Sequence, residues 1–271
     1  MATLAPERKL REAPGARQRV AWAVRDAMTV AKRNLIAYWR TPALIFFAVI
    51  QPVIFVLLFR YVFGGAIHTN VPGGYVDYLT PGIIGQSAAF ASFGTAIGLA
   101  REIQKGVVDR YRSMPMARSA VLTGRLLADL LRMTVTVLVL LGVSTAVGFR
   151  FHNGALPAVG MVVLAVAFGM AITSVSAYLG FVIKDEEAVG SFGLIWLFPL
   201  TFVSSAFVPV ASMPGWLQVF ASNQPVTIVI DEMRALALGG PLGQGAWESA
   251  VCIAGILAVF IPLAVRAYRR V

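Results

Sequence analysis

The sequence predicts an all-α integral membrane protein with six transmembrane helices, and three observations support this fold class. Hydrophobic residues make up 58% of the 271 residues and charged residues only 13%, whereas an average soluble domain is about 25% charged. The mean hydropathy is +0.76. Long apolar stretches separate the charged residues, and the positive ones are concentrated between alternate stretches. A chain with this composition needs lipid around it, so we expect a multi-pass membrane protein.

Stretches without any charged residue locate the spans. A helix needs about 20 apolar residues to cross the hydrocarbon core, within a range of about 17 to 25. Six charge-free stretches reach that length, at residues 41–59, 78–100, 133–149, 151–183, 188–230 and 249–265. Five of them provide one span each, and residues 41–267 together form the predicted transmembrane domain.

The stretch at 188–230 is long enough for two spans, and positive charge decides between one and two. With one span there, and six in total, 20 of the 23 Lys and Arg residues lie on the side that holds both termini. The positive-inside rule assigns that side to the cytoplasm. The second half of the stretch contains residues that disfavour a continuous helix, so we expect it to re-enter the outer leaflet between spans five and six, shielded by protein: Pro209, Pro214, Asn223, Gln224 and Pro225.

The region before the first span divides into two parts. Residues 1–18 are predicted to be a disordered tail, and a signal peptide is not expected because the first apolar run begins only near residue 41. Residues 19–40 predict an amphipathic interfacial helix, since apolar residues recur every three or four positions: Val20, Val24, Met28, Ala31, Leu35 and Tyr38. Trp39 and Arg40 follow at the expected headgroup depth. The alternative is a solvated basic helix that only orients the first span.

The segment between spans two and three, residues 101–118, has the pattern of a second, cytoplasmic amphipathic helix. One face is apolar and another carries charges at ion-pair spacing: Ile103, Val107, Tyr111 and Met114 against Glu102, Lys105, Asp109 and Arg112. Pro115 ends this helix. We expect its apolar face to lie on the membrane surface or in a groove of a partner protein.

Several polar residues lie within or beside the spans. Gln51 and Gln86 either face a substrate path or hydrogen-bond to neighbouring helices. Arg125, Asp129 and Arg132 are interpreted as charges that neutralise one another at the mouth of span three. The charged turn at 184–187 either contacts a cytoplasmic partner or is simply solvated.

Four strings in this order resemble an ABC-2 type transport permease, and within that family the daunorubicin-resistance type of drug exporter subunit. They are Ser113-Met-Pro-Met-Ala-Arg118, Phe207-Val-Pro-Val-Ala-Ser-Met-Pro-Gly-Trp-Leu-Gln218, Asn223-Gln-Pro225 and Asp231-Glu-Met-Arg-Ala-Leu-Ala-Leu-Gly-Gly240. The likeness covers the chain from about Arg25 to Arg270, including the predicted topology. Each string alone is only moderately specific.

The resemblance implies that the helix between spans two and three couples to a cytoplasmic ATP-binding subunit. The coupling residues would be Glu102, Lys105, Gly106, Asp109, Arg110, Arg112, Met114, Pro115 and Arg118. One acid of the family's usual pattern is replaced here, in Arg101-Glu-Ile-Gln-Lys-Gly106. The outer re-entrant segment would contain Pro209, Pro214, Trp216, Asn223, Pro225, Asp231 and Arg234, with the last two close enough to pair.

The function implied is the permease of an ATP-driven exporter that moves a drug-like or lipid-like amphiphile outward across the bacterial cytoplasmic membrane. The chain has no Gly-x-x-x-x-Gly-Lys-Ser/Thr phosphate loop, so ATP and magnesium are expected on a separate subunit and no cofactor on this chain. A second permease chain and membrane lipid are the other expected partners. Candidate lining residues of the substrate path are Gln51, Gln86, Phe90, Ser92 and Phe93; helix packing is the alternative role, especially for the aromatic residues.

Other functions are less well supported by the residues. Export of a glycolipid or polysaccharide by the same architecture stays open. An ion-coupled secondary transporter would need ionisable residues near the bilayer midplane, which the charge-free stretches lack. Two distant histidines and one cysteine favour neither a metal site nor an intramembrane enzyme. The net charge of +10 follows the membrane topology, so no nucleic-acid partner is expected.

Overall fold

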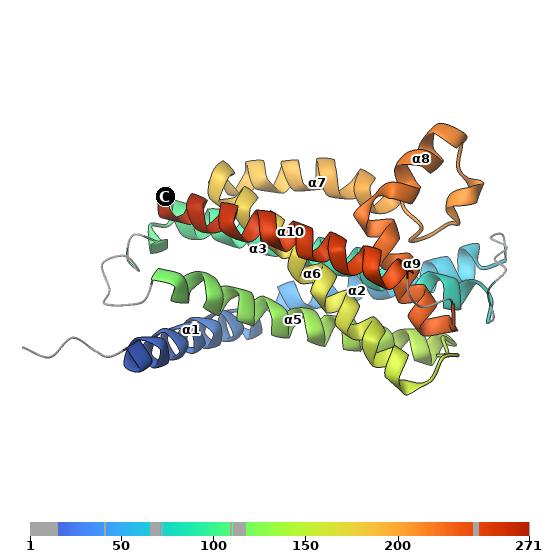
Figure 1. Cartoon of the computed structure of the whole chain (residues 1–271), viewed down its shortest axis with the longest axis horizontal. Helices are drawn as coiled ribbons and strands as arrows, with labels where there is room; N and C mark the ends of the chain where they lie inside the picture. The colour runs from blue at the N-terminus through green and yellow to red at the C-terminus, as the bar shows by residue number, and fades with distance from the viewer. Residues whose placement is uncertain are drawn as a thin grey trace, which may run out of the picture.

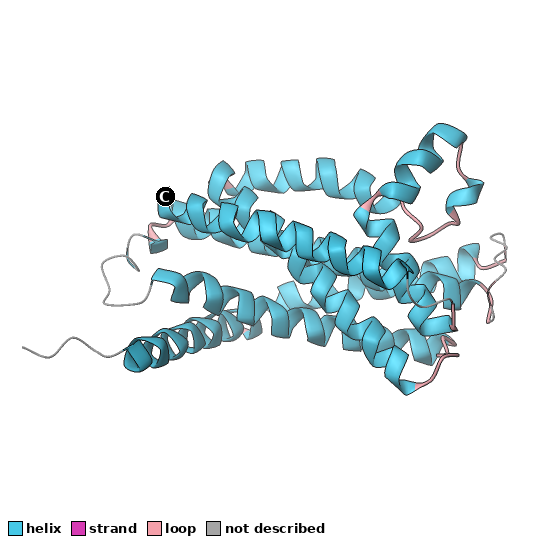
Figure 2. Ribbon diagram, in the orientation of Figure 1, coloured by secondary structure: helices cyan, strands magenta, loops and turns pink. Residues whose placement is uncertain are grey.

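The computed structural model describes residues 16–40, 42–65, 71, 73–108, 110, 118–240 and 244–270. Within these residues the secondary structure is helical throughout, which confirms the all-α class for this part of the chain (Figure 2). The elements are α1 (Ala16–Trp39), α2 (Pro42–Leu58), η1 (Phe59–Phe63), α3 (Tyr75–Gln104), α5 (Arg118–Val147), α6 (Ala155–Ile183), α7 (Glu186–Phe202), η2 (Val210–Ser212), α8 (Gly215–Asn223), α9 (Pro225–Leu238) and α10 (Gln244–Arg270). The beginning of α1 and the C-terminus lie at one end of the bundle, and α8 lies at the other (Figure 1).

Among the residues that the structure describes, four helices are long and apolar enough to cross a membrane: α3, α6 and most of α5 and α10. The helices α2 and α7 have 17 residues each, or about 25 Å at 1.5 Å per residue, against about 30 Å of hydrocarbon. A π-helical turn, η1, prolongs α2. The apolar helices therefore identify the chain as a membrane protein. That α2 and α7 also cross the membrane, which would give six spans, stays a prediction.

The helix α1 packs along α5, and its buried face includes Ala31 of the predicted apolar stripe but not the whole stripe. Ala27 and Val30 are buried, whereas Val24 and Met28 of the predicted stripe are 58% and 60% exposed. Gly124 of α5 explains the choice, because a Cβ there would lie 2.5 Å from the carbonyl oxygen of Ala27. The closest approach selects small side chains, so the larger apolar ones stay outside. Residues 1–15 of the predicted disordered tail, 1–18, lie outside the described residues, and α1 already includes its last three.

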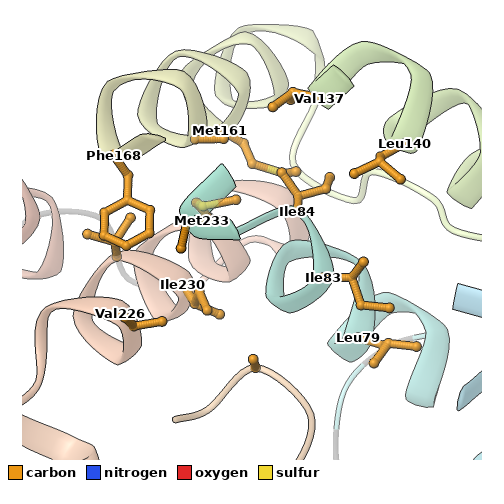
Figure 3. Packing of buried hydrophobic residues seen from close by; sticks show 14 of the residues in the cluster. Leu79, Ile83, Ile84, Val137, Leu140, Met161, Phe168, Val226, Ile230 and Met233 are labelled. Atoms are coloured by element: carbon orange, nitrogen blue, oxygen red, sulfur yellow. The ribbon is translucent and has the colours of Figure 1, made fainter. Parts of the chain in front are cut away.

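The core surrounds α3, which is buried along most of its length. Residues from α3, α5, α6 and α9 meet there, namely Leu79, Ile83, Ile84, Val137, Leu140, Met161, Phe168, Val226, Ile230 and Met233 (Figure 3). The helix α7 packs on α3 through one narrow stripe, Val189, Gly193 and Leu197. Gly193 suits this contact, since a Cβ at that position would lie 1.6 Å from the ring of Phe93 and the ring would have to move.

The apolar stretch 188–230 is interrupted after α7, as its proline and amide residues predict. The helix ends at Phe202, an irregular segment leads to η2, and α8 and α9 follow as two short helices. Figure 1 shows α8 at the end of the molecule opposite the C-terminus. This arrangement is what a re-entrant segment requires, although its depth in a bilayer stays a prediction.

Candidate functional site

Glu102, near the end of α3, connects three helices. Its carboxylate accepts hydrogen bonds from Arg33 of α1, at 2.5 Å, and from Arg125 of α5, at 2.9 Å. The sequence predicted partners on the same helix, and this was wrong for Glu102. Its partners Arg33 and Arg125 are 69 and 23 positions away in the sequence, and the packing of α1 and α5 against α3 brings them to the carboxylate.

The same turn of α3 is also bonded to the beginning of α7. Arg101 forms an ion pair with Glu186, and the Gln104 amide donates to Asp185 at 2.8 Å. Asp185 caps α7 by accepting from the backbone N–H of Ala188 at 2.7 Å. The charged turn at 184–187 therefore holds α7 against α3 instead of being only solvated.

The first residues of the predicted amphipathic helix belong to α3. Residues 101–104 are the last turn of α3, which ends where Gly106 adopts a φ of +64°. Lys105 and Arg110 are exposed. The remaining coupling candidates fall where the structure does not describe the side chain: Asp109, Arg112, Met114, Pro115 and Arg118.

Polar contacts continue along α5 away from this end. Arg132 pairs with Asp129 at 3.0 Å, and the buried Asp129 also accepts from the Thr95 hydroxyl at 2.7 Å. Arg132 donates to the Ala91 carbonyl at 3.0 Å and lies 5.5 Å from the ring centroid of Tyr38. The predicted neutralisation is confirmed for Asp129 and Arg132, whereas Arg125 pairs with Glu102.

The candidates for a substrate path differ in their surroundings within the chain. Gln51 is exposed on α2, and Gln86 is buried on α3. Ser92 is fully buried and lies 3.1 Å from the Ser176 hydroxyl of α6. Phe93 packs on α7 at Gly193, and Phe90 is half-buried. Packing within the chain accounts for Ser92 and Phe93.

At the opposite end, side chains hold the irregular segment that follows α7. Tyr75 and Tyr78 of α3 donate to the carbonyls of Phe207 and Ser205, at 3.0 and 2.9 Å. Arg234 of α9 donates to the same Ser205 carbonyl at 2.9 Å, and its guanidinium lies 3.8 Å from the Tyr78 ring centroid. The expected ion pair between Asp231 and Arg234 is present. The sequence pattern did not indicate either tyrosine, because nothing local links them to residues 127 or more positions away.

The other outer candidates mark the ends of short helices. Pro209 and Pro214 directly precede η2 and α8, and Pro225 is the first residue of α9. Trp216 is 76% exposed on α8. The Asn223 amide donates to the Val219 carbonyl at 2.8 Å within α8.

Two further acidic residues at this end were not predicted from the sequence. Asp77 is buried at the start of α3 and lies 2.7 Å from Nε2 of His152. Glu232 of α9 is also buried. In the sequence it stands next to Asp231 and looks like another surface acid; only the helical phase of α9 relative to its neighbours distinguishes the two.

Comparison with known proteins gives consistent matches. The model of the ABC-2 type transporter family matches residues 25–238. The chain is 34% identical to the daunorubicin resistance ABC transporter permease protein DrrB1 of Streptomyces coeruleorubidus, over 94% of this chain and 90% of that protein. It is 29% identical to the "Probable doxorubicin resistance ABC transporter permease protein DrrC" of Mycobacterium tuberculosis (strain CDC 1551 / Oshkosh), over 95% of this chain and 93% of that protein.

Proposed function

Because the chain belongs to the ABC-2 type transporter family, we propose that it is the permease subunit of an ATP-driven exporter in the bacterial cytoplasmic membrane. The substrate is a drug-like or lipid-like amphiphile that moves outward. The names of the two relatives, a daunorubicin and a doxorubicin resistance permease, support this class of substrate. They also support a role in antibiotic resistance by multidrug efflux.

The proposed topology has six spans, formed by α2, α3, α5, α6, α7 and α10, with both termini in the cytoplasm. Four of these helices meet the length and hydropathy required of a span. The π-turn after α2 supports a longer effective span, since it adds five residues. The segment from η2 to α9 re-enters the outer leaflet, and α1 lies along the inner one.

Energy reaches the permease from a separate ATP-binding subunit, because the chain has no phosphate-binding loop. That subunit docks on the coupling segment, residues 101–118. One observation carries this proposal: the last turn of α3 is bonded to α1, α5 and α7 at once. A push on the segment that follows Gly106 therefore acts on four helices together. Any resulting shift requires the two states to differ in their contacts.

A second permease chain, identical or related, completes the transport unit. Gln51 supports this part of the proposal, because an amide on the exposed face of an apolar helix needs a polar partner or a water-filled cavity within a bilayer. The substrate path would then lie between two chains. Its candidate lining residues are Gln51, Gln86 and Phe90, because packing within the chain does not account for them.

The test is to co-express the permease with its ATP-binding subunit, purify the complex and reconstitute it in liposomes. We expect ATP-dependent movement of a fluorescent amphiphile, and loss of transport in Glu102→Gln but not in Glu248→Gln, an exposed acid at the other end of the bundle. Equal transport in the two variants would remove the coupling role. Extracellular labelling of Lys105 in intact cells would refute the topology.

The same assay separates the alternatives. A glycolipid or polysaccharide exporter would show ATP hydrolysis stimulated by that substrate and not by the amphiphile. A secondary transporter would move the amphiphile without the ATP-binding subunit when an ion gradient is imposed.

A further inference from the structure

Three acidic residues are buried in the described part of the chain, and Glu232 differs from the other two. Asp77 is bonded to His152, and Asp129 to Arg132 and Thr95. The Glu232 side chain forms no ion pair with the described residues, and its Oε1 atom is inaccessible and without a hydrogen-bond partner. The residue as a whole is 4% exposed. A carboxylate buried without a partner is strongly unfavourable, so this group calls for an explanation.

The Glu232 carboxyl group lies against the first turn of α10. A Cβ added to Gly245 would be 2.4 Å from Oε2 of Glu232. One turn later in α10 and one turn earlier in α9, the Ser249 hydroxyl donates to the Ile228 carbonyl at 3.2 Å, so the two helices are also in contact next to the carboxyl group. The space beside the carboxyl does not admit even a methyl group on Gly245. On this side the carboxyl group has no room for another group, whereas a proton needs none.

The elements packed against α9 do not supply a counter-charge. The helices α6 and α8 contain no charged residue. From α10, the nearest charged residue along the chain is Glu248, which is exposed and of the same sign. At this end of α3, Asp77 is engaged by His152. Within α9 itself, Asp231 and Arg234 pair with each other on a different face.

The charged residues of the loop before α6 are also engaged elsewhere. The Arg150 guanidinium donates to the carbonyls of Thr145 and Phe149, at 2.6 and 2.8 Å. The His152 ring faces Asp77, and its backbone N–H donates to the Ala237 carbonyl of α9 at 2.9 Å. These side-chain contacts of Arg150 and His152 are therefore with groups other than Glu232.

We propose that Glu232 is a proton-binding site: its carboxyl group carries a proton while α9 and the first turn of α10 are in contact. Ionisation requires that turn to separate from α9, so that water reaches the carboxylate. We call the contact of α9 with the first turn of α10 the joint; when it forms, Glu232 takes up one proton. This inference goes beyond the proposed export function and does not depend on it.

The direction of the pH dependence follows from burial. Burial raises the pKa of Glu232 above its ordinary value, which is about 4.3 for glutamic acid. The stabilisation by the protonated form is complete below the ordinary pKa and is lost as the pH rises through the raised one. The joint is therefore tightest in acid and loosens toward alkaline pH.

The test uses the full-length permease in lipid nanodiscs and three proteins: wild type, Glu232→Gln and the control Glu248→Gln. Glutamine keeps the shape of the protonated acid. We expect the melting temperature of wild type and of Glu248→Gln to fall with rising pH relative to Glu232→Gln, by about 3 °C for each pH unit between the ordinary and the raised pKa, and to level off above the raised one. Parallel pH profiles for all three proteins would overturn the proposal.

A second measurement is made on the wild-type protein, with Glu232→Gln as its reference. Infrared difference spectroscopy of the wild type, titrated with base, should show the loss of a protonated carboxyl band that Glu232→Gln lacks. Hydrogen exchange of residues 244–250 should accelerate over the same pH range, by about tenfold more per pH unit in wild type than in Glu232→Gln. A Glu232 carboxyl that is ionised while α9 and the first turn of α10 stay in contact, or that ionises without faster exchange, contradicts the proposal.

Discussion

Replacing Glu102 with Gln removes the carboxylate that pairs with the guanidinium groups of Arg33 and Arg125. The exposure of each arginine indicates which of the two ion pairs contributes more to stability. Arg125 is 14% exposed and Glu102 20%, whereas Arg33 is 45% exposed. The Nε atom of Arg125 is already buried without a partner. After the substitution its guanidinium keeps a 3.3 Å hydrogen bond to the Thr95 carbonyl. The inner pair is therefore the one on which the junction depends.

The magnitudes follow from this exposure. A hydrogen bond to a charged, largely buried group contributes about 1.5–3 kcal/mol, while a solvent-screened pair such as that with Arg33 contributes about 0.2–1 kcal/mol. We expect Glu102→Gln to lower the free energy of unfolding by about 2–4 kcal/mol. Arg33→Gln should lower it by less than about 1 kcal/mol.

Double-mutant cycles in equilibrium unfolding from mixed micelles measure these terms separately. The coupling energy of Glu102 with Arg125 should exceed that with Arg33 at least twofold, and added salt should weaken only the second. Glu248→Gln serves as the control, with an expected change within about 0.5 kcal/mol. A larger coupling energy with Arg33 than with Arg125 would refute the ranking by burial.

Three further predictions concern the elements around this junction. Arg101→Glu should reduce transport by the reconstituted complex with little loss of assembly, and the added Glu186→Arg should restore it; failure of the double variant to recover would argue against the pair. Gly193→Ala should destabilise the permease by about 1–3 kcal/mol through its clash with Phe93. An additional Phe93→Leu should relieve part of this loss, as measured by unfolding, and no relief would contradict the packing. Gly106→Ala should add about 1 kcal/mol of backbone strain at its positive φ. It should lower the amount of substrate moved per ATP hydrolysed, whereas Gly142→Ala, which has open space around it, should not.

Much of the bundle follows from the sequence because unpaired charges are excluded from hydrocarbon. The charge-free stretches 78–100 and 249–265 fall within α3 and α10, and the stretch 151–183 ends with α6. The helices α2 and α7 begin within two residues of the predicted places. The helix α5 departs from this rule, since it begins at Arg118 and not near Met133. Its charges are tolerated because α1 and α3 supply their partners.

The contacts of the candidate site were less predictable. Helical spacing limits a sequence argument to neighbours three or four positions away, whereas the partners of Glu102 come from α1 and α5. The burial of Glu232 depends on how α9 is rotated against α10, which hydropathy does not encode. Pairing of Asp231 with Arg234 was predictable because both residues lie on one helix.

The irregular segment after α7 has a consequence for how the protein is made. The backbone of Ser205 is fixed by Thr227 and Arg234, which the ribosome adds 22 and 29 residues later. Gln224, 21 residues downstream, likewise donates to the Val203 carbonyl. When α7 enters the membrane, the turn behind it therefore lacks these three partners, while Tyr75 and Tyr78 of α3 have already been synthesised. Its final conformation must wait until α9 has been synthesised, and a nascent chain that stalls before Gln224 leaves the Val203 carbonyl without its amide donor.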